Sequence, residues 1–318
     1  MNLPDPLLQL GFATLLDAAR DRILLEGLRQ TVGELEIHMV DAELSKFASH
    51  NALARLAALG IRGETYFPVP TILRRRPSLL AYYRMLYGYS QKQFYQTATG
   101  ATKFRSMELR DRIGQQTDAD LDDLCRAFAQ SGEVLIAGLG SSMGSSQYPN
   151  ELCLLTFGAQ LRGSFNNTKG SDGIKAIFAV LKAIFEDETE TTDKRSLTLR
   201  NAAGRKVKVE LAADPDVLVN VDMGQGELRT VVAIEVKAGE DHSNIWNRMG
   251  EAEKSHLKAR ERGISECWTI INDLVAPETQ LRTSSPSTNR FYQLVDLTNP
   301  TNPARAEFAA RVRSMVGL

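Results

Sequence analysis

The spacing of apolar residues changes near residue 130, and this change divides the chain into two parts. Residues 1–130 carry apolar side chains at helical spacing. This period predicts helices with approximate bounds 12–28, 35–47, 52–59, 78–87 and 118–129. Gly60 is expected to cap the third of these helices, and Ser78 to begin the fourth. We therefore predict a mainly helical N-terminal region over residues 1–130.

The second part, residues 131–318, mixes short apolar runs with helical stretches. Runs rich in β-branched residues predict strands at 133–137, 196–200, 206–211, 217–221, 231–236, 266–271 and 291–297. Apolar residues at helical spacing predict helices at 171–186, 243–263 and 303–315. Helix, hairpin strands, helix and strand in this order predict an α/β fold with a mixed sheet flanked by helices.

One predicted hairpin, residues 214–237, combines buried-type strands with charged residues. Gly224 and Gly226 separate its two strands. Side chains alternate along a strand, so Glu235 and Lys237 share one face while Val236 points to the other. Asp216 opens the first strand and Glu235 lies near the end of the second. Both carboxylates are therefore expected to meet at one end of the hairpin.

Two carboxylates beside an ammonium group suit a divalent-metal site for phosphodiester chemistry. Mg²⁺ prefers oxygen ligands, so Asp216, Glu235 and the carbonyl of Val236 are the candidate metal ligands. Lys237 could hold the attacking water and offset charge that develops on the phosphate. The candidate catalytic residues are thus Asp216, Glu235 and Lys237. The alternative is a solvated hairpin with a cross-strand ion pair, because an isolated Glu-x-Lys is common.

The order of these residues resembles the PD-(D/E)XK nuclease motif. Pro215-Asp216 supplies its first half, and Glu235-Val236-Lys237 supplies the second half. The resemblance implies a restriction-endonuclease-like fold in which this hairpin belongs to the catalytic core, over residues 131–318.

Residues 74–105 form the most basic and aromatic segment of the chain. Arg84, Lys92 and Lys103 could contact DNA phosphates. Alternatively, the aromatic residues fill a core and the cations extend to solvent, an interpretation we favour for Tyr82. A second polar segment, residues 162–170, offers further candidate DNA contacts: Arg162, Asn166, Asn167 and Lys169. For this segment a turn built on Asn-Asn-Thr is the slightly favoured prediction.

Two segments of the N-terminal region resemble one particular family of nucleases. Residues 77–95, which begin Pro-Ser-Leu-Leu-Ala-Tyr-Tyr-Arg, and residues 59–71 resemble blocks of the XcyI-type family of type II restriction endonucleases. The resemblance implies a Mg²⁺-dependent homodimer that cuts both strands of double-stranded DNA at a short, palindromic, G/C-rich, CCCGGG-like site. It also implies 5′-phosphate ends and a cognate DNA methyltransferase. The N-terminal region would then take part in DNA binding and dimerisation. Alternatives are a repair or junction-resolving nuclease and a non-catalytic DNA-binding relative.

Composition changes this picture little. The 318 residues include 38 Lys and Arg against 39 Asp and Glu, a formal net charge of −1, which does not exclude a local basic cleft. Cys125, Cys153 and Cys267 have no metal-ligand spacing and are expected to be buried thiols in a reducing cytosol. Without a membrane-length apolar run or a signal-peptide pattern, the expected location is the cytoplasm.

Four further features carry weaker predictions. The Gly- and Ser-rich residues 138–146 lack nucleotide-binding spacing and are expected to be a surface loop. Glu186 is a candidate third acidic ligand, and His242 is a candidate neighbour of the site that is better explained as a solvated residue. Residues 251–262 are expected to be a solvated helix face with ion pairs four residues apart.

Overall fold

The computed structural model describes residues 6–140, 145–224, 227–239, 245–272 and 277–318. The chain forms two compact units, residues 1–163 and residues 164–318. The sequence placed this boundary at 130/131 instead. The difference arises because the long helix α10 (Tyr148–Ile184) contributes its first turns to the N-terminal unit and continues into the second unit.

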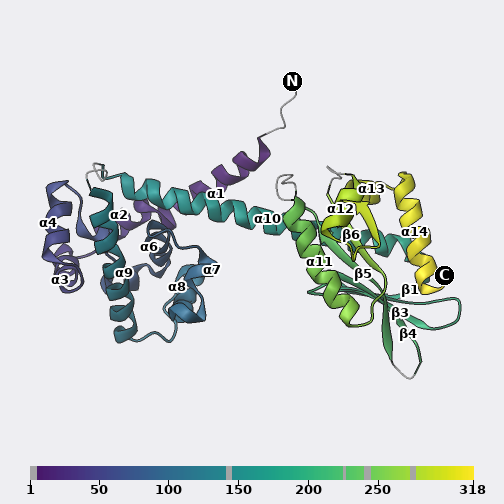
Figure 1. Ribbon diagram of the computed structural model, residues 1–318. Helices are drawn as coiled ribbons and strands as arrows, with labels where there is room; N and C mark the ends of the chain where they lie inside the picture. The colour runs from purple at the N-terminus through teal and green to yellow at the C-terminus, as the bar shows by residue number, and fades with distance from the viewer. Residues whose placement is uncertain (1–5, 141–144, 225–226, 240–244, 273–276) are drawn as a thin grey trace. The chain divides into compact units, whose positions relative to one another are not determined.

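The N-terminal unit is helical throughout the part that the structure describes, as predicted (Figure 1). Its α-helices before α10 are α1 (Leu7–Ile23), α2 (Leu25–Gly33), α3 (Ile37–Phe47), α4 (His50–Ala58), α5 (Pro70–Arg75), α6 (Leu80–Leu86), α7 (Gln91–Phe94), α8 (Arg105–Arg110) and α9 (Asp118–Leu139). Gly60 follows α4 with a positive φ of 68°, which suits a glycine at a helix end. Ser78 does not begin a helix as predicted. It lies inside a short 3-10 turn, Pro77–Leu79, that precedes α6.

Buried aromatic side chains form much of the core of this unit. Tyr82 and Tyr83 on α6 are fully buried, and their hydroxyls donate to the carbonyls of Thr65 and Glu64 at 2.8 Å. The prediction that Tyr82 packs in the core is confirmed.

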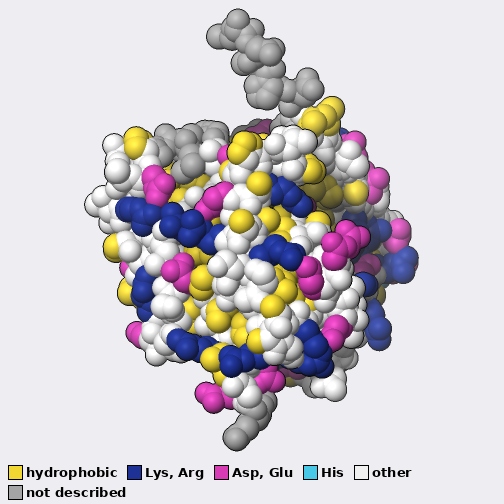
Figure 2. Space-filling view, turned by 90° about the vertical axis from the view of Figure 1, so that its right-hand side faces the viewer, with side chains coloured by type: hydrophobic (Ala, Val, Ile, Leu, Met, Phe, Trp, Pro, Cys, Tyr) yellow, Lys and Arg dark blue, Asp and Glu magenta, His cyan; other side chains and the backbone are white. Residues whose placement is uncertain are grey.

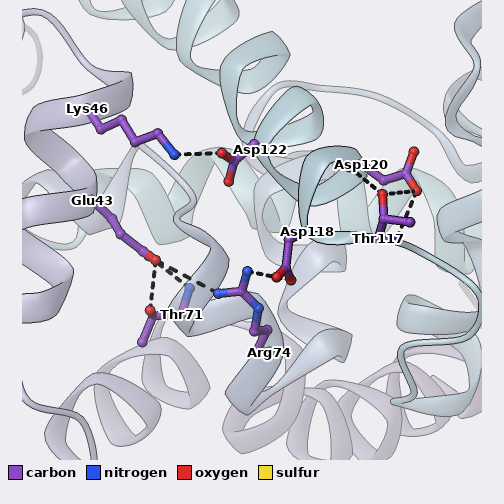
Figure 3. A network of polar contacts seen from close by, with 8 residues as sticks. All are labelled: Glu43, Lys46, Thr71, Arg74, Thr117, Asp118, Asp120 and Asp122. Atoms are coloured by element: carbon purple, nitrogen blue, oxygen red, sulfur yellow. Dashed lines mark hydrogen bonds and ion pairs between the residues drawn. The ribbon is translucent and has the colours of Figure 1, made fainter.

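Figure 3 shows how polar contacts join α3, α5 and α9: Glu43, Lys46, Thr71, Arg74, Asp118 and Asp122 link the helices, while Thr117 and Asp120 form the capping box of α9.

The second unit is built on a seven-stranded sheet whose order follows the sequence (Figure 1). Its strands are β1 (Thr189–Thr192), β2 (Ser196–Arg200), β3 (Lys206–Leu211), β4 (Val217–Asp222), β5 (Leu228–Lys237), β6 (Cys267–Ile271) and β7 (Arg290–Gln293). Strands β1 to β5 pair antiparallel, and β5, β6 and β7 pair parallel. The predicted mixed sheet flanked by helices is therefore confirmed.

The two faces of the sheet are covered by different helices. Val232, Ile234 and Val236 of β5 point into a core with α10 and with α14 (Pro303–Val316). The opposite face carries Ala233 and packs against α11 (Ile245–Glu261). The alternation predicted for this strand therefore holds. Helices α12 (Glu278–Ser284) and α13 (Leu294–Thr298) complete the unit.

Three predicted elements were wrong. Residues 133–137 continue α9, because buried positions at helical spacing (Leu124, Phe128, Gly132 and Ile136) extend its apolar stripe while Val134 stays 74% exposed. Residues 162–170 lie within α10 and form no turn. The predicted strand 291–297 is strand only to Gln293, after which α13 begins. In the described part of the chain, no helix has the length and apolar character needed to span a bilayer.

Candidate active site

A cleft of about 660 Å³ opens at the end of β5 in the second unit. Its floor is the end of the hairpin of β4 and β5, with Asp216, Val236 and Lys237. One wall is α10, which contributes Asn166, Asn167, Gly170, Ser171, Ile174 and Lys175. The other wall is the first part of α11, with Asn247, Arg248 and Glu251.

The two strands of the hairpin place Asp216 beside the end of β5, as the sequence predicted. Val217 pairs with Ile234, so the residue before β4 lies level with Glu235. Oδ2 of Asp216 accepts a hydrogen bond of 2.8 Å from the main-chain N–H of Val236. Burial and the neighbouring charge of Glu235 raise the pKa of Asp216 to about 6. A bound cation would stabilise the charged form of Asp216.

Glu235 and Lys237 lie on the same face of β5 and contact one another. Nζ of Lys237 is 2.9 Å from Oε1 of Glu235 and 3.4 Å from Oε2 of Glu251. Glu235 is buried, with 6% of its surface exposed. Burial opposes the charge on Lys237, but Glu235 and Glu251 outweigh it, so the pKa of Lys237 lies above its ordinary value. The ammonium group therefore stays charged at the cleft.

The donor set fits a hard divalent cation with few protein ligands. Among the residues that the structure describes, no group of three or more His, Cys, Asp and Glu side chains could hold a metal ion. The carboxylates of Asp216 and Glu235 at the end of the hairpin are therefore the candidate ligands, and the main-chain N–H of Val236 contacts Asp216. Mg²⁺ suits such a site because it keeps several waters and takes substrate phosphate oxygens as ligands.

Helix α11 carries side chains that reach the catalytic hairpin, and sequence reasoning missed their role. Glu251 contacts Lys237, the hydroxyl of Ser255 donates to Oε2 of Glu235 at 2.8 Å, and Lys258 pairs with Asp214 at 2.5 Å. Positions 251, 255 and 258 are four and three residues apart and share one side of a helix. The expectation that 251–262 is merely a solvated face is wrong, because Ser255 and His256 are buried. The sequence did contain a signal for this contact: Ser255, a small residue with a hydroxyl, lies at helical spacing between the charged residues Glu251 and Lys258.

The predicted DNA contacts on α10 divide between the two units. Asn166 and Asn167 are exposed and line the cleft. Nζ of Lys169 lies 4.7 Å from the ring centroid of Phe165. Arg162 is exposed but belongs to the N-terminal unit.

Of the candidates in the basic segment, Arg84 must be withdrawn. Its side chain is fully buried and forms a bidentate pair with Glu108, with Nη2 at 2.8 Å from Oε1 and Nε at 2.9 Å from Oε2. A phosphate cannot reach a guanidinium in that position. Lys103 is half-exposed and pairs with Asp120, while Lys92 is exposed on α7. On the face shown in Figure 2, Lys and Arg are interspersed with Asp and Glu, in keeping with the balanced composition.

Of the minor candidates, Glu186 is not brought to the cleft. Glu186 is exposed in a 3-10 turn after α10 and is not among the residues that line the cleft. His242 lies outside the described residues, as do residues 141–144 of the predicted Gly- and Ser-rich loop, whose first two residues end α9. The three cysteines are buried and form no disulfide, as expected of cysteines that pack as small apolar residues.

The fold and this site together define a class of protein. A mixed sheet with Pro-Asp before one hairpin strand and Glu-x-Lys at the end of the next is the core of a restriction-endonuclease-like nuclease. The model of the XcyI restriction endonuclease family matches residues 13–318, so the chain belongs to that family.

Two named relatives agree with this assignment. The chain is 42% identical over 320 residues to the type II restriction enzyme XcyI of Xanthomonas campestris pv. cyanopsidis, covering 100% of this chain and 96% of the relative. It is 41% identical over 317 residues to the type II restriction enzyme Cfr9I of Citrobacter freundii, covering 99% and 96%. The predicted family is confirmed, and the protein is a site-specific deoxyribonuclease of the type II class.

Proposed function

We propose that this enzyme cuts both strands of DNA at a short, palindromic, G/C-rich site of the CCCGGG type, with Mg²⁺, and leaves 5′-phosphate ends. The observation that carries the proposal is the cleft lined by Asp216 and Lys237, with the buried Glu235 in contact with Lys237. Membership of a family of type II restriction enzymes supports it over a repair nuclease. The intact acidic and basic residues argue against a non-catalytic DNA-binding relative.

In this proposal each catalytic residue has a separate task. Asp216, Glu235 and the carbonyl of Val236 would hold Mg²⁺, which supplies Lewis acidity toward the scissile phosphate when it is bound. Lys237, charged and anchored by Glu235, orients the attacking water and offsets negative charge on the phosphate. The buried floor formed by Val236 keeps this charge pair in a partly dry environment, where it acts more strongly than in water.

DNA would lie over the cleft and along α10. Asn166 and Asn167 line the same cleft, which supports a role for them in contacting bases or phosphates beside the catalytic residues. Lys169 and Arg162 extend this set along the helix, and Lys92 and Lys103 are the remaining cationic candidates of the N-terminal unit. That unit would contribute to DNA binding and dimerisation.

A palindromic site is read most economically by a two-fold homodimer in which each subunit cuts one strand. We therefore propose a homodimer that works in the cytoplasm beside a cognate DNA methyltransferase, which protects the same sites in the host genome. A methyltransferase gene adjacent to this gene would support that pairing.

The direct test is digestion of a plasmid of known sequence with Mg²⁺, followed by sequencing of the ends. We expect cuts at one palindromic sequence, 5′-phosphate termini and no cutting with EDTA. Asp216→Ala and Glu235→Ala should each abolish cutting and keep the circular dichroism spectrum of the wild type. Folded variants that still cut at wild-type rate would remove these residues from the mechanism. Cuts at branched structures regardless of sequence would favour a junction-resolving nuclease.

A further inference from the structure

Both carboxylate oxygens of Glu235 have a partner from the protein. Oε1 lies 2.9 Å from Nζ of Lys237, which is part of the catalytic motif itself. Oε2 accepts a hydrogen bond of 2.8 Å from the hydroxyl of Ser255, which lies on α11, twenty residues further along the chain. Because these two contacts use different oxygens, they fix the rotation of the carboxylate about its own axis.

Ser255 is held in place by its surroundings. It is 4% exposed, on the face of α11 that packs against β5. The next residue, His256, is fully buried and hydrogen-bonded through Nε2 to Oγ1 of Thr269 at 2.8 Å. Thr269 pairs with Glu235 in the register between β6 and β5. The helix therefore contacts two neighbouring strands through adjacent polar residues, which sets its position along the sheet.

Ser255 lies between two carboxylates: its hydroxyl donates to Oε2 of Glu235 at 2.8 Å, and it also stabilises the charged form of Asp214. The carboxylate of Asp214 already pairs with Lys258 at 2.5 Å, and this pair together with Ser255 lowers the pKa of Asp214 below its ordinary value. On the other side, Glu251 contacts Lys237 rather than the hydroxyl. In each of these two ion pairs, at least one of the two side chains is more than one-third exposed, so the pair contributes little stability by itself. Of these contacts, the buried hydrogen bond from Ser255 is therefore the one whose removal is expected to have the largest effect.

We propose that Ser255 is a positioning residue of the active site: its hydroxyl holds Oε2 of Glu235 so that Oε1 faces Lys237 and the cation. The inference rests on the proposed Mg²⁺ dependence. Groups that hydrogen-bond to a metal ligand orient it, and their removal typically costs about 10- to 100-fold in metal affinity or activity. A hydroxyl from the helix after the Glu-x-Lys strand would thus act on the cation without touching it.

The test measures cation binding separately from cleavage. Ca²⁺ binding to the full-length protein with cognate DNA is measured by titration calorimetry, and the Mg²⁺ concentration for half-maximal single-turnover cleavage is measured in parallel. Ser255→Ala should weaken Ca²⁺ binding and raise the half-maximal Mg²⁺ concentration by about 10-fold or more. Ser255→Thr keeps the hydroxyl and should recover most of the affinity, even if its added methyl group lowers the melting temperature.

The matched control is Ser287→Ala. Ser287 is also a buried serine, and its hydroxyl donates to Oε1 of Glu253 on the same helix at 2.7 Å, away from Glu235. This variant should lose comparable stability and keep the cation affinity of the wild type. Wild-type Ca²⁺ affinity in Ser255→Ala, equal weakening in Ser287→Ala, or a folded Ser255→Thr as weak as Ser255→Ala would each overturn the inference. A wild-type enzyme that binds no Ca²⁺ and cuts without Mg²⁺ would instead overturn the proposed function.

Discussion

Single residues in this protein take their roles from burial more than from their type. Arg84 and Lys237 are both cations beside a glutamate. Arg84 is fully buried and satisfies Glu108, whereas Lys237 is 19% exposed at the floor of a cleft. The first arrangement stabilises a core, and the second keeps a charge where substrate can meet it. The two residues therefore respond differently to the same truncation.

Lys237→Ala should lower the rate of cleavage by orders of magnitude and leave specific DNA binding nearly unchanged. The ammonium group is most useful where negative charge develops in the transition state, so its loss falls on the rate rather than on the affinity. Single-turnover cleavage and equilibrium binding with Ca²⁺ in place of Mg²⁺ separate the two quantities. Equal losses in both would make Lys237 a phosphate anchor instead.

Arg84→Ala should destabilise the protein by about 3–5 kcal/mol, the usual cost of leaving a buried charge without its partner. Burial opposes ionisation of Glu108, but Arg84, Tyr95 and Gln91 outweigh it and hold the pKa of Glu108 below its ordinary value. Urea denaturation measures the loss. Lys46→Ala is the control, because it breaks an exposed pair with Asp122 and should cost under about 1 kcal/mol. Similar costs for both variants would contradict the structural role of Arg84.

At the scale of elements, the site depends on how closely helices approach the end of one strand. Helix α10 crosses beside β5 at Gly173, where a Cβ atom would lie 2.2 Å from Cβ of Ala238. Ala238 directly follows Lys237, so this contact sets the distance between the cleft wall and its catalytic floor. Helix α11 fixes the opposite wall through Ser255 and Lys258.

Gly173→Ala should therefore displace α10 from the end of β5, with a loss of about 1–3 kcal/mol from overpacking and a lower cleavage rate. Melting temperature and single-turnover rate are the measurements. Gly158→Ala lies on the same helix with nothing within 4 Å of its new Cβ. It should be neutral or stabilising by up to about 1 kcal/mol, since alanine favours the helix over glycine. Wild-type stability and activity in Gly173→Ala would mean that α10 shifts freely.

DNA contacts along α10 and in the N-terminal unit should separate by their dependence on salt. Lys92→Ala and Arg162→Ala should weaken binding to all sequences alike and reduce the salt slope by about one unit each, if these cations contact phosphates. Asn166→Ala and Asn167→Ala remove no charge and should leave the slope unchanged while they lower discrimination between cognate and other DNA. Affinity measured at several salt concentrations on both DNAs decides. Unchanged slopes in both charge variants would exclude those positions from the interface.

For the whole molecule, the proposed homodimer would bring one such cleft from each subunit, so each subunit is expected to cut one strand. A mixed dimer of a wild-type subunit and a Glu235→Ala subunit, purified with two different tags, should nick one strand and release little linear product. Plasmid relaxation on a gel distinguishes nicked from linear DNA. Full double-strand cutting by the mixed dimer would show that one site serves both strands in turn.

The amino-acid sequence alone was enough to predict the hairpin of β4 and β5. Local rules are strong there, because strands of β-branched residues alternate in period two and Gly224 after β4 adopts a positive φ of 114° that favours glycine. Spacing along the chain was therefore enough to bring Asp216, Glu235 and Lys237 to one end of the hairpin. The same was true of the helical N-terminal region and of the family, which residues 59–71 and 77–95 indicated by their resemblance to it. In these segments near neighbours in the chain decide the conformation.

Tertiary structure decided the rest, because it depends on contacts between distant residues. Residues 133–137 and 162–170 are helical because α9 and α10 extend beyond the segments for which the local sequence predicts a helix. Arg84 is excluded as a DNA contact because it is buried and paired with Glu108, which lies 24 residues away in the chain. Ser255 gained its contact with Glu235 because α11 packs across β5, a fact that no spacing within either element contains. A side chain's partner across a sheet is a property of packing, and only the folded chain supplies it.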